Sequence, residues 1–376
     1  MNFTYTEDQL AIKEVADRMF RDLGGDEQIK ACYAEPIPFH KELWQKLAES
    51  GLIAVPLATQ YGGSEMGMTE LCLVIEAQGR AVAPIPLIET AVECAMPIGQ
   101  FASDELKQRI LPGVSSGEMV LCSVRPYQGL RDRQPLTASI DGNTWVLNGH
   151  SSLVTYAPIA NGFLVSAKTE TGENWVGYCD AQINGLSITN QKTTSSETAG
   201  HLVFEGVQVA DANTIAVGDA ADALLEWKAQ RTYAAIAAQQ VGLLKEGLTR
   251  AAEYTNERKQ FGRSLSSFQA VAQQAADAYM AIEALRGVYW RALDDIDAGR
   301  NAELSARVAK FWVCEAGHVA AHISLHIHGG IGQDLDYPAH RFFVWAKRNE
   351  SYLGAADKHA VALGHLIKGD PQKVAL

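Results

Sequence analysis

Apolar side chains recur at helical spacing along the first third of the chain. They follow the sequence Thr6-Glu7-Asp8-Gln9, which fits the capping box that begins many helices. The first such positions are Ile12, Val15 and Met19. Two further amphipathic stretches cover residues 40–52 and 69–83. We therefore predict an N-terminal helical domain over residues 1–117.

The pattern changes to that of short strands between residues 118 and 216. The stretches rich in β-branched and aromatic residues are MVLCSV, WVLN, GFLVSA, WVGYC, LSIT and HLVFEGVQV. Turn sequences such as Asp141-Gly142-Asn143 and Thr171-Gly172 separate them. This alternation predicts a middle β-sandwich or β-barrel domain.

Helical spacing returns over residues 217–376. Leu224 opens long alanine-rich helices, and one apolar face extends far beyond an average helix. Its members are Phe268, Val271, Ala275, Ala278, Ile282, Leu285 and Tyr289. We predict a C-terminal four-helix bundle, of a kind that often forms the core of an oligomer. The fold class is then α+β, with helical and sheet parts segregated.

Composition narrows the classes of function. The net charge of −12 argues against a nucleic-acid-binding protein. No apolar stretch approaches the ~20 residues of a membrane helix, and the polar start MNFTYTEDQL is not expected to be a signal peptide. The six scattered cysteines form no C-x-x-C pair, which predicts reduced thiols in a cytoplasmic protein.

One cationic stretch, TNERKQFGRSLSSFQAV, joins two predicted helices. Arg258 and Lys259 precede Phe261-Gly262, and Arg263 follows. Taken alone, the stretch reads as a solvated connection. A local arginine cluster can nevertheless bind phosphate on an acidic protein, because charges are screened over ~8–10 Å.

Four motifs in order resemble the acyl-CoA dehydrogenase family, and the resemblance covers essentially the whole chain. They are VPLATQYGG, HLVFEGVQVADAN, NERKQFGRSLSSFQAV and HIHGGIGQDLDYPAHRFF. The resemblance implies an FAD-dependent oxidoreductase that dehydrogenates a CoA thioester and passes electrons to an electron-transfer flavoprotein. It also implies a dimer or tetramer in which two subunits share each FAD.

The resemblance implies which residues would bind FAD. Arg258 would pair with the diphosphate, and Phe261 would lie along the ribose and adenine. His326 takes a position that is usually glutamine and touches the adenine end. The other implied FAD-binding residues are Gln269, Gly329, Gly330, Gly332 and Thr155.

The chain departs from the family where a subunit builds its own catalytic pocket. Dehydrogenation requires a carboxylate that removes the α-proton of the thioester. The usual base position is Leu353, and the position used by a smaller group is Thr232. Related steroid and dicarboxylate members often have a glutamate about two turns further on, where this chain reads Gln239-Gln240.

The β domain departs from the family as well. The flavin-facing Trp-x-Thr reads Leu153-Val154-Thr155, and the loop over the substrate reads Val124-Arg125-Pro126. The chain thus retains the residues that would bind the FAD of a neighbouring subunit, and it lacks the residues that would form its own catalytic pocket. We therefore predict a subunit of a heteromeric acyl-CoA dehydrogenase, of the steroid side-chain or dicarboxyl-CoA type, whose catalytic sibling supplies the base.

Alternatives remain open from the sequence. Glu350 or Glu226 could be a displaced base in an active homomeric enzyme, and Arg231 could neutralise a substrate carboxylate or fill the vacated base position. The chain could also be a binding or scaffold protein without flavin. His318, His322 and His326 have the spacing of a helical metal site, but isolated histidines on a helix are more often not ligands, and we predict no metal.

Overall fold

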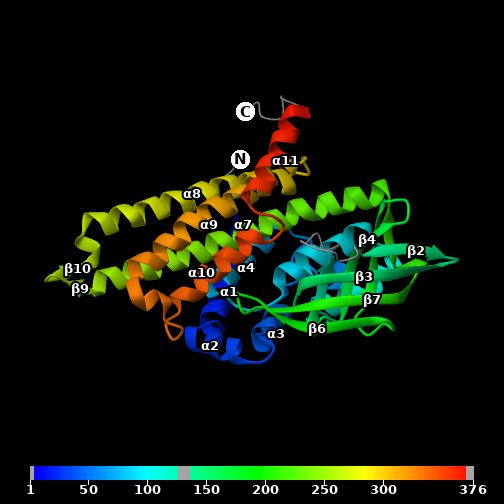
Figure 1. Ribbon diagram of the computed structural model, residues 1–376, viewed down its shortest axis with the longest axis horizontal. Helices are drawn as coiled ribbons and strands as arrows, with labels where there is room; N and C mark the ends of the chain where they lie inside the picture. The colour runs from blue at the N-terminus through cyan, green and yellow to red at the C-terminus, as the bar shows by residue number, and fades with distance from the viewer. Residues whose placement is uncertain (1–3, 126–135, 370–376) are drawn as a thin grey trace. The chain divides into compact units, whose positions relative to one another are not determined.

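The computed structural model describes residues 4–125 and 136–369 (Figure 1). The chain divides into two compact units, each assembled from separate segments. Unit 1 comprises Met1–Ile29, Met68–Ala83 and Tyr233–Leu376. Unit 2 comprises Lys30–Gly67 and Pro84–Thr232.

Unit 1 is almost entirely helical. Its elements are α1 (Glu7–Leu23), the start of α2 (Asp26–Ala34), α4 (Met68–Ala81), most of α7 (Asp219–Glu257), β9 (Lys259–Gln260), β10 (Arg263–Ser264), η5 (Leu265–Ser267), α8 (Gln269–Asp297), α9 (Glu303–His328), η6 (Gly329–Gln333), α10 (Ala339–Ser351) and α11 (Ala356–Gly369). The predicted capping box begins α1, because the Thr6 side chain accepts from the Gln9 backbone and the Gln9 side chain accepts from the Thr6 backbone.

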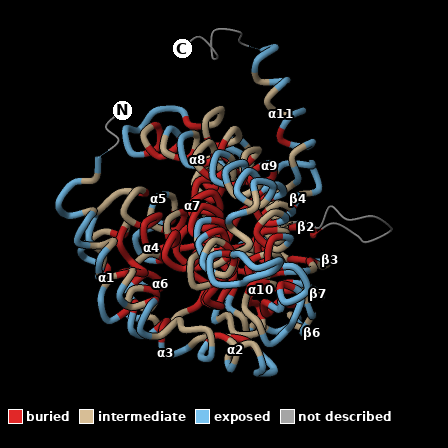
Figure 2. The backbone as a smooth tube through the Cα atoms, turned by 90° about the vertical axis from the view of Figure 1, so that its left-hand side faces the viewer, coloured by how far each residue is buried: buried red, intermediate tan, exposed pale blue. Residues whose placement is uncertain are grey.

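Two glycines let helices α4 and α7 cross at backbone contact. A Cβ added at Gly79 would lie 2.1 Å from the Gln239 carbonyl oxygen, and one added at Gly242 would lie 2.0 Å from the Glu76 carbonyl oxygen. No side chain fits at either point. This crossing carries α7 through the interior of unit 1, and Figure 2 colours much of α7 as buried while α11 is largely exposed.

Unit 2 contains the sheet. Its helical elements are the end of α2, α3 (Lys41–Glu49), η1 (Thr59–Tyr61), the π-helix η2 (Ile88–Ala95), α5 (Met96–Phe101), α6 (Asp104–Ser115), η3 (Ala157–Ile159), η4 (Asp211–Asn213) and the first turns of α7. Its strands are β1 (Leu121–Val124), β2 (Thr137–Asp141), β3 (Thr144–Thr155), β4 (Gly162–Thr169), β5 (Asn174–Asp180), β6 (Leu186–Lys192), β7 (Thr198–Ala210) and β8 (Thr214–Val217).

The strands pair in the order β6-β7-β3-β2-β4-β5-β8, and β1 joins β4. The pairs β1–β4 and β2–β4 are parallel, and the other pairs are antiparallel. Trp175 lies fully buried on β5, and its indole N–H donates to the Thr214 hydroxyl at 3.1 Å. Buried and more exposed residues alternate along the first half of β3, as in a strand with one face toward a core.

The structure confirms the predicted α+β fold, with helices, then strands, then helices along the chain. The domain bounds 1–117, 118–216 and 217–376 stay a prediction. Strands β2 and β8 were not predicted, and α7 begins at Asp219 rather than at Leu224. Arg231 lies inside α7. No helix among the described residues has the length and apolarity needed to cross a membrane.

The apolar face predicted for α8 is only partly buried. Ala278, Ile282, Leu285 and Tyr289 are buried, as expected. Val271 and Ala275, nearer the start of the helix, are only half-buried. Tyr279 and Met280 are 59% and 60% exposed, so the first half of α8 presents apolar side chains to solvent.

Candidate functional site

A two-residue hairpin leaves the end of α7 at the tip of unit 1 (Figure 1). Strands β9 and β10 pair through Gln260 and Arg263, which leaves Phe261 and Gly262 as the loop. Both loop residues have positive φ, 53° and 79°, as in a type I′ turn. A phenylalanine is a poor choice there, because its side chain makes positive φ costly. Phe261 is also 93% exposed, so no packing within the described chain offsets that strain.

The hairpin carries three exposed cations, Arg258, Lys259 and Arg263. The Arg258 N–H donates to the Tyr254 carbonyl at 2.8 Å, which extends the α7 hydrogen-bond pattern. The Arg263 guanidinium lies 4.0 Å from the centre of the Phe268 ring, and Phe268 meets Phe261 edge-on at 6.2 Å. The turn is thus an aromatic pair with charge on both flanks.

The glycine segment begins where α9 ends. Gly329 has φ 65° and ψ −144°, a conformation that is essentially restricted to glycine. A Cβ at Gly329 or Gly330 would meet no atom within 4 Å, so the backbone is open to approach there. Gly332 differs, because it is buried and its Cβ would lie 2.8 Å from the Leu325 carbonyl oxygen. Its glycine is required by packing.

Aromatic and polar contacts bring the hairpin and the glycine segment to the same end of unit 1. The Tyr254 ring, one turn before Arg258, stacks on His328 with centroids 5.1 Å apart. His326 Nδ1 lies 3.1 Å from Gln274 Oε1, which links α9 to α8. We call the exposed set Arg258, Phe261, Gln269, His326, Gly329 and Gly330 the hairpin–glycine surface.

The turn between α10 and α11 contains Leu353, with φ 62°. A fully buried lysine on α9 holds this turn. Lys310 Nζ donates to the carbonyl oxygens of Glu350 at 3.1 Å and Gly354 at 2.9 Å, and it lies 3.3 Å from the Cys314 thiol. Burial lowers the pKa of Lys310. The turn geometry is therefore fixed although its central side chain is a leucine.

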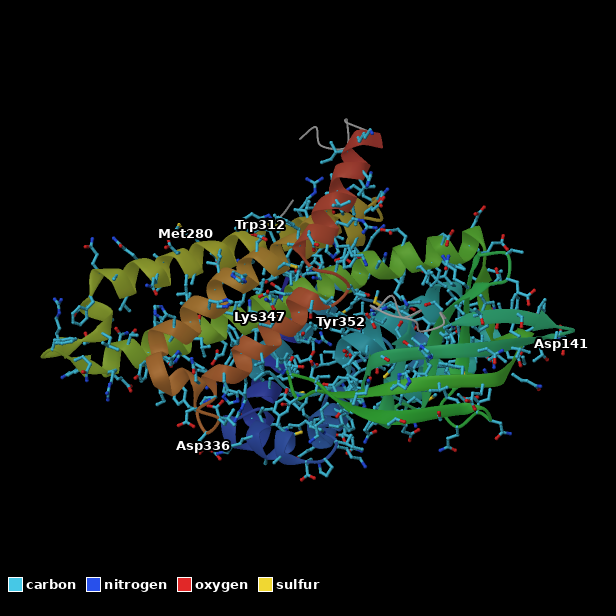
Figure 3. All side chains as sticks on the ribbon, viewed as in Figure 1. Asp141, Met280, Trp312, Asp336, Lys347 and Tyr352 are labelled. Atoms are coloured by element: carbon cyan, nitrogen blue, oxygen red, sulfur yellow. The ribbon has the colours of Figure 1, made fainter. Side chains whose placement is uncertain are left out.

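Glu350 lies on the last turn of α10 and is engaged by Lys347, which Figure 3 labels on the same helix. Lys347 Nζ donates to both carboxylate oxygens, at 2.9 and 3.1 Å. The His318 ring nitrogen lies 3.1 Å from the same Lys347 Nζ. Both carboxylate oxygens of Glu350 are therefore already engaged in hydrogen bonds within the chain.

Gln240 occupies a buried position between helices and is used at both ends. Its Nε2 donates to the Val313 carbonyl at 3.3 Å, and its Oε1 accepts from Asn349 Nδ2 at 2.9 Å. The amide therefore links α7, α9 and α10. An ionised glutamate could accept from Asn349 but could not donate to Val313.

In unit 2, Thr155 ends β3 and pairs with Ala199 of β7. The register between these strands shifts between Ser151 and Val154, and Leu153 takes φ 57° within the shift. Its backbone N–H donates to Gln191 Oε1 at 2.8 Å, and its side chain is 56% exposed. The strand therefore keeps an outward-facing residue at Leu153, but without an aromatic ring.

One arginine and one lysine of unit 2, Arg125 and Lys228, lie close to β1. The Arg125 guanidinium pairs with buried Glu93, and Pro126 lies outside the described residues. Lys228 Nζ, itself buried, donates to Ser123 Oγ at 2.8 Å. Burial and the Arg125 charge lower the pKa of Lys228 to about 8, against the pull of Glu93.

Arg231 is held against its own helix. Its guanidinium lies 3.5 Å from the centre of the Trp227 ring, and Nη1 donates to the Trp227 carbonyl at 3.1 Å. Thr232, one position on, donates its hydroxyl to the Lys228 carbonyl at 2.9 Å. Neither residue supplies a carboxylate.

The helical histidines have other partners. The rings of His318 and His322 lie 4.4 Å apart, and His322 packs edge-on against Phe343. Within residues 4–125 and 136–369, no group of three histidine, cysteine or acidic side chains is placed to hold a metal ion. All six cysteines are free thiols.

Sequence reasoning missed the two buried lysines. Lys228 and Lys310 stand among alanines on long helices, where a lysine normally belongs to the solvated face. No spacing signal distinguishes them from exposed lysines, because their acceptors lie on distant segments. Only the tertiary fold identifies their contacts.

Two family descriptions match the chain. Residues 6–118 match the acyl-CoA dehydrogenase N-terminal domain, and residues 224–363 match the acyl-CoA dehydrogenase C-terminal domain. The protein "Acyl-CoA dehydrogenase FadE27" of Mycobacterium tuberculosis is 32% identical over 379 residues, covering 99% of this chain and 100% of the relative.

Two solved structures contain chains that are similar to this one, the first in a complex and the second in a steroid ACAD. The ChsE4-ChsE5 complex from Mycobacterium tuberculosis contains a chain with a TM-score of 0.92 and 32% identity, with 98% of this chain and 99% of that chain covered. A variant of the Tcur3481-Tcur3483 steroid ACAD contains one with a TM-score of 0.89 and 36% identity, with 96% and 98% covered.

Proposed function

This chain belongs to the acyl-CoA dehydrogenase family of FAD-dependent oxidoreductases, and we propose that it is the half-site subunit of a heteromeric member. In this proposal the hairpin–glycine surface binds the diphosphate and adenine end of an FAD whose isoalloxazine lies in a sibling subunit. The sibling supplies the carboxylate base. The assembly is cytoplasmic, acts on a bulky acyl-CoA such as a steroid side-chain thioester, and passes electrons to an electron-transfer flavoprotein.

The observation that carries the proposal is Phe261. A bulky aromatic residue at positive φ costs ~1–3 kcal/mol, and such strain persists chiefly where function requires it. Phe261 is also 93% exposed beside exposed Arg258. A ring that is largely exposed and lies close in sequence to a guanidinium suits a ligand that has both a flat base and a diphosphate.

The other residues of the surface fit the same group. Gly329 and Gly330 leave open space where a side chain would project. Because Gln274 Oε1 can only accept, His326 donates through Nδ1 and keeps Nε2 as an acceptor for the adenine amino group. The Arg258 guanidinium would pair with two phosphate oxygens through its planar fork. Bound FAD supplies the hydride acceptor for the α,β-dehydrogenation.

The residues at the two usual base positions also support the proposal. Leu353 stands in the turn where most family members have glutamate, and Thr232 stands at the other base position. Glu350 is bonded through both oxygens to Lys347. The named complexes of similar chains, ChsE4-ChsE5 and Tcur3481-Tcur3483, are the precedent for a two-protein assembly.

The test is to purify the chain alone and together with a sibling family member that retains the glutamate. We expect little flavin and no turnover from the lone chain, and a yellow, active complex from the pair. Full flavin content and turnover by the lone chain would contradict the proposal. A colourless, inactive complex would instead favour a scaffold protein without cofactor.

The Phe261→Asn variant separates function from structure. Asparagine tolerates positive φ in a type I′ turn, so the hairpin should become about 1 kcal/mol more stable. Loss of the ring should weaken FAD retention by the complex. If Phe261 had only a structural role, a variant that stabilises the hairpin would not weaken FAD retention. Lys259→Asn, an exposed neighbour on the same hairpin, is the matched control.

A further inference from the structure

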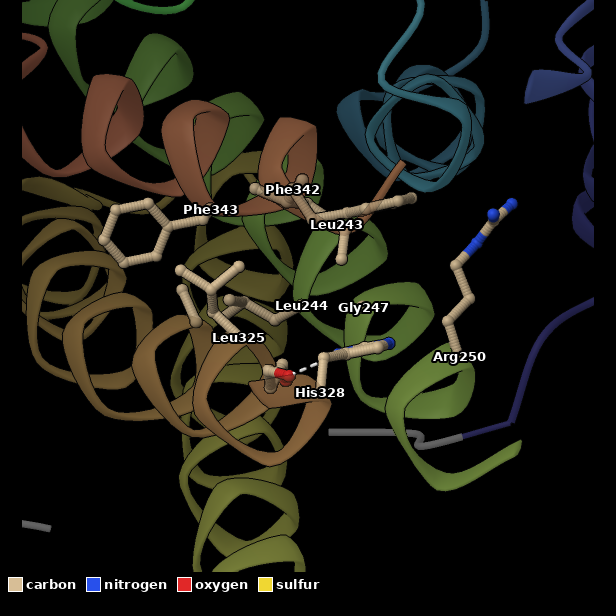
Figure 4. Close-up of a pocket in the computed structure, with 11 residues that line it drawn as sticks. Leu243, Leu244, Gly247, Arg250, Leu325, His328, Phe342 and Phe343 are labelled. Atoms are coloured by element: carbon tan, nitrogen blue, oxygen red, sulfur yellow. Dashed lines mark hydrogen bonds between the residues drawn. The ribbon is translucent and has the colours of Figure 1, made fainter. Parts of the chain in front are cut away.

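Helices α7, α9 and α10 of unit 1 enclose a cavity of about 10 Å³ (Figure 4). Its lining is mostly apolar, with Leu243, Leu325 and Phe342 among its walls. Three polar side chains also line it, those of Arg250, Ser324 and His328. A space of this size holds about one water molecule.

Two of these polar side chains have atoms without a partner. Ser324 Oγ and His328 Nε2 are both buried, and neither forms a hydrogen bond within the described part of the chain. The two residues are 7% and 4% exposed. A buried polar atom without a hydrogen bond costs ~1–3 kcal/mol, so these atoms require an explanation.

The His328 ring has a defined tautomer. Its Nδ1 lies 2.6 Å from the Ser324 carbonyl oxygen, marked by the dashed line in Figure 4. A carbonyl oxygen can only accept, so Nδ1 must carry the hydrogen. Burial and the nearby Arg250 lower the pKa of His328, which favours the neutral ring. Nε2 is then a bare acceptor on a residue that lines the cavity.

We propose that this cavity is a binding site for one ordered water molecule, which donates to His328 Nε2 and bonds Ser324 Oγ. The chemistry of the lining excludes other occupants. A metal cation or ammonium ion would find no carboxylate among the lining residues. The space accommodates about one water molecule, which is smaller than any organic ligand. A hydroxyl can donate or accept, so Ser324 can complete the water's bonds in either direction.

The water would fix the last turn of α9. His328 is the final residue of that helix, and its ring stacks on Tyr254 and lies 5.5 Å from Tyr337. Gly329 follows directly. Holding the His328 ring therefore sets the direction in which the glycine segment leaves the helix. This consequence for FAD rests on the proposed function, whereas the water site itself does not.

The first experiment is a high-resolution crystal structure of the assembled protein, with ¹⁵N NMR of the histidine rings. We expect density within hydrogen-bonding distance of both Ser324 Oγ and His328 Nε2, and an Nδ1–H tautomer for His328. A dry cavity, a direct Ser324–His328 bond or an Nε2–H tautomer would overturn the proposal.

The second experiment uses His328→Phe and Ser324→Ala. Both variants should lose the density, and FAD affinity of the complex should fall about 2- to 10-fold, the equivalent of one hydrogen bond. His340→Phe is the control, because His340 also bonds carbonyl oxygens through Nδ1 but does not line the cavity. If the variants lose the water and FAD affinity does not change, the water does not position the glycine segment. If the proposed function itself is wrong, the unmodified complex will bind no FAD.

Discussion

Lys228 offers a quantitative test of the buried charge in unit 2. Lys228 is 5% exposed, and its ammonium group donates to Ser123 Oγ and lies near Arg125, Glu93 and Cys94. Burial is the main cause that lowers its pKa from 10.5 to about 8. At 1.36 kcal/mol per pKa unit, the charged form costs the folded state about 3 kcal/mol.

The sign of the pH dependence follows from proton binding. Between about pH 8 and pH 10.4 the unfolded chain holds the Lys228 proton and the folded chain has released it. Stability from this group therefore rises with pH across that window, and the full penalty is present below pH 8. Lys228→Met removes both the cost of the buried charge and the pH dependence that this group gives to stability. The stability of the variant relative to the unmodified protein should thus fall by about 3 kcal/mol from pH 7 to pH 10.5.

The measurement is urea unfolding of both proteins at several pH values from 7 to 10.5. Lys192→Met is the matched control, because Lys192 is exposed at the end of β6 and its replacement should give a flat difference. A Lys228→Met difference that does not change with pH, or that grows as pH rises, would refute the assignment of a lowered pKa. Ser123→Ala tests the hydrogen bond separately, since it removes the acceptor and leaves the buried ammonium.

The remaining predictions concern packing and catalysis. Gly242→Ala would place a Cβ 2.0 Å from the Glu76 carbonyl oxygen, so α4 must move and stability should fall by ~1–3 kcal/mol in chemical denaturation. Gly247→Ala on the same helix is the control, because its Cβ would meet its nearest atom at 3.5 Å and the variant should be neutral or stabilising. Equal losses of stability in the two variants would show that the close helix crossing at Gly242 is not the cause. Glu350→Gln should leave turnover of the assembled enzyme unchanged, because the Lys347 contact already engages the carboxylate. A loss of tenfold or more in steady-state rate would favour Glu350 as a displaced base.

Local signals in the sequence were sufficient for the order of the elements. The Thr6 capping box, the helical spacing on α4 and the β-branched stretches of β4 and β7 all depend on neighbours close in sequence. Short strands without such a signal were missed. β8, Thr214–Val217, is four residues long and forms only because β5 provides its pairing edge.

Helix α8 shows why a periodic face does not guarantee burial. Its spacing is regular from Phe268 to Tyr289, but only the second half packs against buried neighbours. Tyr279 and Met280 interrupt the polar side with exposed apolar groups. Periodicity reports that a helix is amphipathic and does not report what covers it.

Sequence motifs identified the residues of the candidate site. The structure shows the different physical role of each residue. The sequence treated Gly329, Gly330 and Gly332 alike. The structure separates a required conformation at Gly329 and open backbone at Gly330 from a packing requirement at Gly332. Gln240 likewise appeared as an uncharged substitute for a base, whereas both of its amide ends are used between helices.

The turn at Leu353 explains how a chain can lose a base and keep the framework around it. Lys310 is fully buried, and its hydrogen bonds go to the Glu350 and Gly354 carbonyl oxygens on either side of Leu353. If the turn moved, the ammonium group would be buried without those acceptors, at a cost of several kcal/mol. The Leu353 side chain takes no part in these bonds, since only backbone carbonyls accept them. Replacing an acid at this position is therefore nearly neutral for the fold, while any rearrangement of the turn destabilises it. Under the proposed function, a base can therefore be lost at this position by one substitution, and the turn persists because Lys310 holds its backbone.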